Sequence, residues 1–127
     1  MQSTPTIVHI IDDDSAVRES LEALLGVSGF EVETYGSAED YLARGDGMDG
    51  CIVLDIHMPG MGGLDLLQIL AGRERRVPVL VLTASRETRV EERALQLGAS
   101  AFLTKPVREA TLVEALRSAQ IRGKGTP

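Results

Sequence analysis

Five short apolar runs alternate with segments of helical periodicity along this chain, and this alternation constrains the fold more than any other feature. The runs lie at residues 7–11, 30–35, 51–54, 78–82 and 101–103. The segments between them repeat apolar residues along one helix face, as Val17, Leu21 and Leu25 do in the first. Strands that alternate with helices build a parallel sheet covered by helices on both faces. We therefore predict an α/β fold of (βα)5 type, a doubly wound parallel sheet.

The polarity of the five runs predicts the order of the strands. The first, third and fourth runs are the most apolar, as expected of central strands that are buried on both faces. The run at 30–35 alternates apolar and polar residues, so one of its faces meets water, and the run at 101–103 is short. These two runs fit the edges of the sheet. The order 2-1-3-4-5 satisfies both conditions and is common among doubly wound sheets.

Length and charge narrow the class of protein further. A chain of 127 residues fits one domain, which we place at 1–122, followed by a linker-like tail at 123–127. The net charge of −6 argues against direct nucleic-acid binding by this domain. The sequence offers neither a membrane-spanning apolar stretch nor a signal peptide, and its single cysteine cannot form an internal disulfide. We therefore expect a cytoplasmic domain without membrane contact.

Polar residues end or follow four of the five predicted strands. Asp12 and Asp13 follow the first, Asp55 ends the third, Thr83 ends the fourth and Lys105 follows the fifth. The carboxyl ends of parallel strands meet at one edge, and ligands bind there at the switch point, here between the first and third strands. The sequence thus predicts a site of three acids, a hydroxyl and an ammonium group.

Three neighbouring carboxylates require compensation of their charge. At about 4 Å and an effective dielectric near 20, each like-charge pair costs about 4 kcal/mol, so a proton, Lys105 or a metal must offset the repulsion. An open set of oxygen ligands suits Mg²⁺, with Mn²⁺ as a possible substitute. His9 and Cys51 are not placed to bind zinc and are interpreted as core residues. Asp14 is interpreted as a helix cap.

Four motifs in sequence order resemble a known family. They are Ile11-Asp12-Asp13, Leu54-Asp55-Ile56-His57-Met58-Pro59-Gly60, Leu82-Thr83-Ala84 and Phe102-Leu103-Thr104-Lys105-Pro106. Together they resemble the receiver domain of response regulators in two-component signalling, over residues 7 to about 122. The resemblance implies the flavodoxin-like fold of chemotaxis protein CheY.

The resemblance assigns roles to the acids. Asp55 matches the phosphoacceptor, which receives a phosphoryl group and also contacts the metal. Asp13 matches a direct Mg²⁺ ligand, and Asp12 matches an acid that holds the metal through water. The backbone carbonyl of His57 matches the remaining protein ligand.

The resemblance also assigns a switch. Thr83 matches the hydroxyl that bonds a phosphoryl oxygen, and Lys105, expected to precede a cis peptide bond to Pro106, matches the cation that pairs with Asp55 or its phosphate. Phe102 matches an aromatic side chain that turns inward when Thr83 moves. We expect this movement to reshape the face built from the fourth helix, fifth strand and fifth helix, around residues 90–97, 101–103 and 112–116.

A signalling function follows from the resemblance. The expected partner is a sensor histidine kinase whose phosphohistidine donates the phosphoryl group. The expected output is transcription regulation through a phosphorylation-dependent homodimer formed by the reshaped face. The domain is expected to be a phosphoacceptor and not a turnover enzyme. His57 and Ser85 are expected to tune the lifetime of the phosphorylated state.

Three alternatives remain open. The domain could act alone by docking to another protein. A Mg²⁺-dependent phosphatase with an aspartate nucleophile would need a second Asp two residues after Asp55, where His57 stands. A flavin-binding electron carrier would need a phosphate-binding loop after the first strand, where three consecutive acids would instead repel phosphate.

Overall fold

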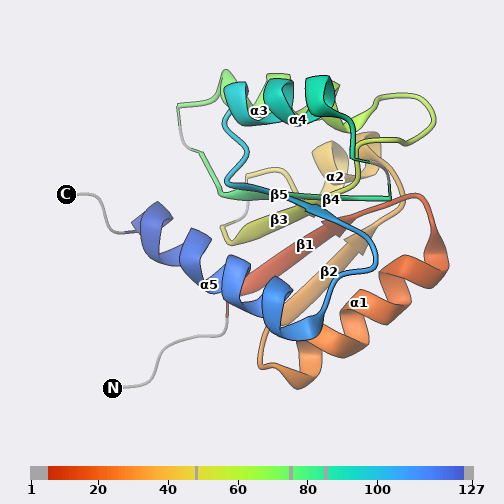
Figure 1. Cartoon of the computed structure of the whole chain (residues 1–127), viewed down its shortest axis with the longest axis vertical. Coiled ribbons are helices and arrows are strands. Elements are labelled where there is room, and N and C mark those ends of the chain that lie inside the picture. Colours follow the sequence, from red (N-terminus) through yellow and green to blue (C-terminus); the bar gives the residue numbers. More distant parts are fainter. Residues whose placement is uncertain (1–5, 48, 75, 85, 125–127) are drawn as a thin grey trace.

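The predicted doubly wound sheet is confirmed. The computed structural model describes residues 6–47, 49–74, 76–84 and 86–124, of which 120–124 are described by their backbone alone. Five parallel strands form one sheet in the order β2-β1-β3-β4-β5 (Figure 1). The strands are β1 (Ile7–Ile11), β2 (Glu31–Tyr35), β3 (Cys51–Leu54), β4 (Val79–Thr83) and β5 (Ala101–Thr104).

Five helices follow the strands in turn. They are α1 (Ser15–Val27), α2 (Ala38–Arg44), α3 (Gly63–Ala71), α4 (Thr88–Gln96) and α5 (Glu109–Lys124). Asp14 caps α1, as predicted, because its carboxylate accepts from the backbone N–H groups of Ala16 and Val17. Helix α5 includes residues 123 and 124 of the expected tail, and residues 125–127 lie outside the described part of the chain.

The helices cover both faces of the sheet. Figure 1 shows α1 and α5 on one side and α2, α3 and α4 on the other. Each side has its own apolar cluster: Leu21, Leu25, Leu112 and Leu116 belong to the first, and Tyr41, Leu66, Leu67 and Ala94 to the second. Both clusters are completed by strand residues, since alternate side chains of a strand point to opposite faces.

His9 and Cys51 are buried, as the sequence interpretation expected. His9 is 1% exposed; its Nδ1 lies 2.8 Å from the Tyr35 hydroxyl and its Nε2 lies 3.2 Å from the Asp49 main-chain oxygen. Because a carbonyl only accepts, Nε2 carries the proton and donates to Asp49, while Nδ1 accepts from Tyr35. Burial raises the pKa of the Cys51 thiol to about 11, so this side chain is an inert part of the core.

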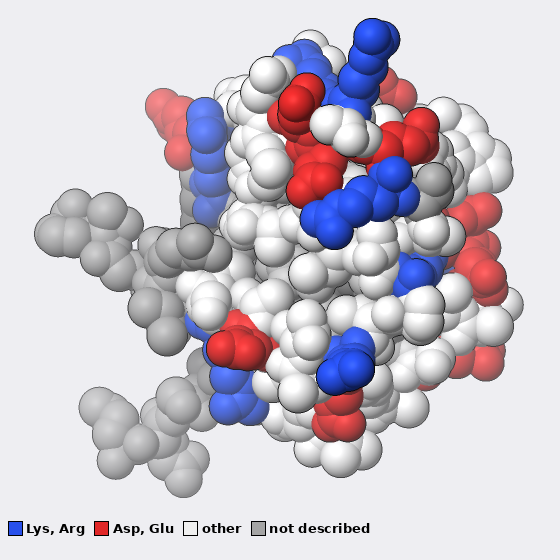
Figure 2. All heavy atoms as spheres, viewed as in Figure 1, with Lys and Arg blue, Asp and Glu red and all other residues white. Residues whose placement is uncertain are grey.

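The outer surface has an exposed edge strand and a mixed distribution of charge. Glu31 and Glu33 are exposed along β2, which confirms the wet face of this edge strand. On the face shown in Figure 2, the Lys and Arg side chains of the described residues are scattered among acidic and uncharged ones and form no continuous basic patch. Among the described residues, the helices are all too short or too polar to cross a bilayer.

Candidate functional site

The register of the sheet brings the predicted site residues to one edge. Ile11 pairs with Leu54, and the N–H of Asp55 donates to the Ile11 oxygen over 3.0 Å, so Asp12 and Asp55 leave neighbouring strands at the same level. On the other side, Leu54 pairs with Val81, which places Thr83 within about one strand residue of that level. Parallel pairing therefore assembles a site whose members are far apart in the sequence.

Lys105 joins this edge through β5. Thr83 pairs with Thr104, and the Lys105 N–H donates to the Thr83 oxygen over 2.8 Å. The peptide bond from Lys105 to Pro106 is cis, as predicted. All five residues predicted for the site thus come from strand ends or from the residues that follow them.

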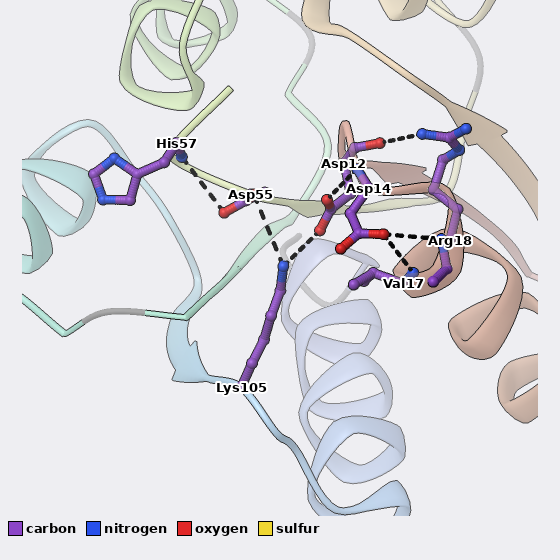
Figure 3. Close-up of polar contacts among 8 residues, drawn as sticks. Asp12, Asp14, Val17, Arg18, Asp55, His57 and Lys105 are labelled. Carbon is purple, nitrogen blue, oxygen red and sulfur yellow. Dashed lines mark hydrogen bonds and ion pairs between the residues drawn. The ribbon is translucent and has the colours of Figure 1, made fainter. Parts of the chain in front are cut away.

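The ammonium group of Lys105 lies between two buried carboxylates. Its Nζ is 2.7 Å from Asp12 Oδ2 and 3.8 Å from Asp55 Oδ2 (Figure 3). The shorter contact is with Asp12, whereas the resemblance implied pairing with Asp55. Asp12 Oδ1 also accepts from the Asp14 N–H over 2.9 Å, so both oxygens of this carboxylate have partners. The weaker contact leaves the Asp55 carboxylate more available for reaction.

The environment of Asp55 changes its acidity. The side chain is buried, and its Oδ1 accepts from the His57 N–H over 3.4 Å. Burial raises the pKa of Asp55 above its ordinary value, the Asp12 carboxylate raises it further, and Lys105 partly opposes both effects. A more basic carboxylate is a stronger nucleophile and interacts more favourably with a nearby cation.

The three acids fit a divalent metal ion. Asp12, Asp13 and Asp55 each offer a carboxylate oxygen, and these oxygens lie within 4.8 Å of one another. The donor set is made of hard oxygen ligands on the rim of the sheet, with Asp13 exposed to water, and this combination suits Mg²⁺. His57, two residues after Asp55, lies in the same loop, and its N–H faces the Asp55 carboxylate (Figure 3), so the expected role of its carbonyl stays a prediction.

Thr83 has a buried donor without an acceptor. The residue is 1% exposed, and its Oγ1 has no hydrogen-bond partner among the described residues. An isolated buried hydroxyl costs free energy, and most are paired in native proteins. Its place at the end of β4, beside the strand that Asp55 follows, makes it a ready donor to a group attached to Asp55.

The loop after Asp55 holds helix α3 tightly against the site. A Cβ on Gly63 would lie 2.5 Å from the Asp55 main-chain oxygen and 2.8 Å from the Cα of Ile56. Only glycine permits this approach, by which the first residue of α3 packs directly onto the end of β3. The close packing of Gly63 therefore restrains the backbone of Asp55.

The other predicted site residues have distinct surroundings. Phe102 is buried at 6% exposure, and the Arg86 guanidinium carbon lies 5.8 Å from the centre of its ring. The His57 imidazole is exposed, and its Nε2 lies 3.1 Å from Glu87 Oε1 at the start of α4. Ser85 lies outside the described residues, so its expected effect on the lifetime of a phosphoryl group stays a prediction.

Three residues near the site were missed by the sequence reasoning. Arg18 donates to the Asp12 main-chain oxygen, Glu87 contacts His57, and Arg86 covers Phe102. The position of Arg18 four residues after the Asp14 cap places it on the first turn of α1 facing the loop, which was a usable signal. No sequence signal connects Glu87 with His57, since the two are 30 residues apart and meet only through the fold.

Comparison with known proteins agrees with the fold and with the family that the motifs resemble. The profile described as the response regulator receiver domain matches residues 8–117. The transcriptional regulatory protein FixJ of Azorhizobium caulinodans is 45% identical over 112 residues, which cover 87% of this chain and 53% of that protein. The response regulator protein TmoT of Ectopseudomonas mendocina is 35% identical over 120 residues, covering 94% of this chain and 54% of that protein.

Solved structures give the same result. The response regulator StyR superposes with a TM-score of 0.87 at 36% identity, covering 97% of this chain and 62% of that one. The chemotaxis protein CheY4 of Vibrio cholerae superposes with a TM-score of 0.82 at 25% identity, covering 91% of this chain and 98% of that one.

This chain belongs to the response regulator receiver domain family. It spans about half the length of the curated relatives it matches, such as FixJ and TmoT. Receiver domains bind Mg²⁺ at an acidic pocket and work with sensor kinases, and these relatives are described as regulators, in the case of FixJ of transcription. In this chain, Asp12, Asp13 and Asp55 form an acidic cluster that could hold such an ion.

Proposed function

We propose that Asp55 accepts a phosphoryl group from the phosphohistidine of a sensor histidine kinase, in a reaction that requires Mg²⁺. The observation that carries this proposal is the Thr83 hydroxyl, which is buried at the end of the neighbouring strand without a partner among the described residues. A phosphoryl group on Asp55 would bring three acceptor oxygens to this donor. Such a ligand would account for the unpaired hydroxyl, and this supports the proposal.

The proposed transfer uses the groups already in place. A carboxylate oxygen of Asp55 forms a bond to phosphorus while the phosphorus–nitrogen bond of the phosphohistidine breaks, and the electron pair of that bond leaves with the imidazole. Asp12, Asp13 and Asp55 would hold Mg²⁺, which would supply positive charge to the phosphoryl oxygens. Lys105, 3.8 Å from Asp55, supplies a second positive charge, and the buried Asp55 keeps a basic oxygen for the attack.

The phosphorylated state would differ from the free state in charge and hydrogen bonding. A phosphoryl group adds about −1.5 to −2 charges at neutral pH. Both Thr83 and Lys105 would be drawn to it, and β4 would carry the loop before α4 with it. Arg86 belongs to that loop and its guanidinium group lies over the ring of Phe102 on β5, so the proposed switch would reach the face formed by α4, β5 and α5.

The proposed output is control of transcription by a longer protein that contains this domain. Support comes from FixJ, a transcriptional regulatory protein of which the chain covers about half. We propose that phosphorylation promotes a homodimer through α4, β5 and α5, and that the protein works in the cytoplasm, where a kinase obtains ATP. Because Asp55 itself carries the product, the domain would be a phosphoacceptor and not a turnover enzyme.

Intact mass after incubation with acetyl phosphate and Mg²⁺ tests the central step. The wild-type chain should gain one phosphoryl group that is labile in base, whereas Asp55→Asn should gain none. Chelation of the metal should prevent the gain in the wild type. Equal phosphorylation of Asp55→Asn and the wild type would overturn the assignment of the acceptor. As a control, Asp14→Asn changes a neighbouring acid that caps α1 and should still be phosphorylated.

A further inference from the structure

Arg18 is a basic residue beside the acidic site to which neither the motifs nor the proposed transfer gives a role. It is half-buried on α1, and its Nη1 donates to the main-chain oxygen of Asp12 over 2.7 Å (Figure 3). Asp12 is the residue at which β1 gives way to the loop that carries the acids. The contact therefore joins the first helix to the backbone of the site itself.

The surroundings of Arg18 hold its guanidinium group in place. A Cβ on Gly36, in the turn after β2, would lie 3.5 Å from Nη1 and 3.8 Å from Cζ, so the group packs closely along this turn. The Arg18 N–H donates to the Asp14 oxygen over 3.1 Å within the first turn of α1. From its place in the first turn of α1, the Arg18 side chain thus links the end of β1 with the turn after β2.

The contact with Arg18 completes the restraint of Asp12. The carboxylate of Asp12 is held by the Asp14 N–H and by Lys105, and its carbonyl is held by Arg18. Because the carbonyl of Asp12 belongs to the peptide plane that also contains the nitrogen of Asp13, fixing this plane limits the directions that both side chains can take. Loss of the contact would free the loop to turn its two acids apart.

We propose that Arg18 is a positioning residue for the metal centre, holding Asp12 and Asp13 in the arrangement that binds Mg²⁺. This inference rests on the proposed metal site, to which it adds a residue outside the ligand set. A planar guanidinium that both donates and packs on a turn is not replaced by a lysine ammonium, even though the charge is the same. The role therefore depends on shape as well as charge.

Calorimetric titration of the unphosphorylated chain with MgCl₂ tests the proposal. Arg18→Met should weaken Mg²⁺ binding about tenfold, the usual scale for loss of a group that orients ligands. Arg18→Lys keeps the charge and should remain clearly weaker than the wild type. Arg93→Met is the matched control, because it removes the same charge from the last turn of α4, and its affinity should equal that of the wild type.

A second readout separates positioning from general damage. With acetyl phosphate, Arg18→Met should need more Mg²⁺ for half-maximal phosphorylation, while its rate at saturating Mg²⁺ stays within about twofold of the wild type. Wild-type affinity for Mg²⁺ in Arg18→Met, or in Arg18→Lys, would overturn the positioning role. If Arg18→Met does not fold, Arg18→Lys alone decides. Failure of the wild type to bind Mg²⁺ would instead overturn the proposed function.

Discussion

The buried hydroxyl of Thr83 should lower the free energy of unfolding of the unphosphorylated protein. Since its Oγ1 has no partner among the described residues, Thr83→Val replaces an unsatisfied donor by a methyl group of similar size. We expect the free energy of unfolding to rise by about 1 kcal/mol in the absence of phosphate. Urea denaturation measures this change, and a less stable Thr83→Val would contradict the absence of a partner.

A neighbouring threonine supplies the control for this prediction. Thr104 pairs with Thr83 across β4 and β5 but is only half-buried. Thr104→Val should therefore change the free energy of unfolding by less than about 0.5 kcal/mol. With Mg²⁺ and a beryllofluoride phosphate mimic, the wild type should become more stable than Thr83→Val. The reason is that the wild type gains a hydrogen bond from Thr83 that Thr83→Val cannot form.

The buried His9 should make the free energy of unfolding depend on pH. Burial lowers the pKa of His9 below its usual value, so the folded state resists protonation more than the unfolded state does. Its contribution is full above the unfolded pKa, near 6.5, and is lost as pH falls from there towards the lower folded pKa. Urea denaturation between pH 7.5 and about 5 should show this loss in the wild type.

The comparison for His9 is a variant without the imidazole. His9→Asn removes the group that titrates, so its free energy of unfolding should fall less steeply over the same pH range. Its absolute stability should be lower at neutral pH, because the contacts with Tyr35 and Asp49 are altered. Identical slopes for the two proteins would show that His9 is protonated as easily in the folded state as in the unfolded one.

The motifs predicted which side chains meet at the site but not how they pair. Strand ends place Asp12, Asp55 and Lys105 together in any sheet of this order, so their proximity follows from the sequence. The preference of Lys105 for Asp12 over Asp55 depends on differences of about one ångström in a finished structure. Contacts such as Arg18 with Asp12 depend equally on side-chain packing, which periodicity does not report.

At the scale of elements, α3 approaches the end of β3 so closely that a single methyl group added at Gly63 should lower the stability of the protein. Gly63→Ala would place a Cβ against the backbone of Asp55 and Ile56, which cannot rotate away as a side chain could. We expect a loss of about 2 kcal/mol in the free energy of unfolding, typical of overpacking. Phosphorylation by acetyl phosphate should also slow, because the displaced backbone carries Asp55.

Gly26→Ala is the matched control for the same change of side chain. Gly26 lies within α1, and a Cβ there would meet no other atom within 4 Å. Alanine is the better helix former, so this variant should gain about 0.5–1 kcal/mol. Urea denaturation of both variants compares the two environments, and a destabilised Gly26→Ala or a neutral Gly63→Ala would contradict the packing described.

The boundaries of the elements show where sequence patterns stop being informative. The apolar run at 78–82 predicted the fourth strand, but β4 begins at Val79 and includes Thr83. Pro78 has no N–H to donate, and its carbonyl accepts from Ile52, so it borders the sheet without belonging to β4. Thr83 and Thr104 are polar and so ended their predicted runs, yet they pair with each other as the last residues of β4 and β5.

For the whole molecule, the arrangement of layers separates the site from the proposed output face. The acids lie at the carboxyl ends of β1 and β3, whereas α4 and α5 lie on opposite sides of the sheet next to the β5 edge (Figure 1). We expect the proposed signal to pass through β4 and β5, the strands that carry Thr83 and Phe102 and, in the case of β5, precede Lys105. This geometry favours a response at the β5 edge over one at β2.

Self-association upon phosphorylation is the prediction that belongs to this scale. Leu95 on α4 is 47% exposed and lies on the proposed interface, where dimerisation would bury it. We expect the wild type to be a monomer alone and a dimer with Mg²⁺ and beryllofluoride, as measured by sizing with light scattering. Leu95→Glu should stay monomeric in both conditions, because a buried, unpaired charge at an interface is costly.

Val27→Glu distinguishes this interface from general apolar contact between copies of the chain. Val27 is 87% exposed at the end of α1, on the opposite side of the sheet from α4, and its replacement introduces the same charge. This variant should dimerise with beryllofluoride as the wild type does. Dimerisation of Leu95→Glu would contradict an interface at α4. Loss of dimerisation in Val27→Glu would point to an interface at α1. A wild type that stays monomeric with the mimic bound would show that the activated domain signals without pairing.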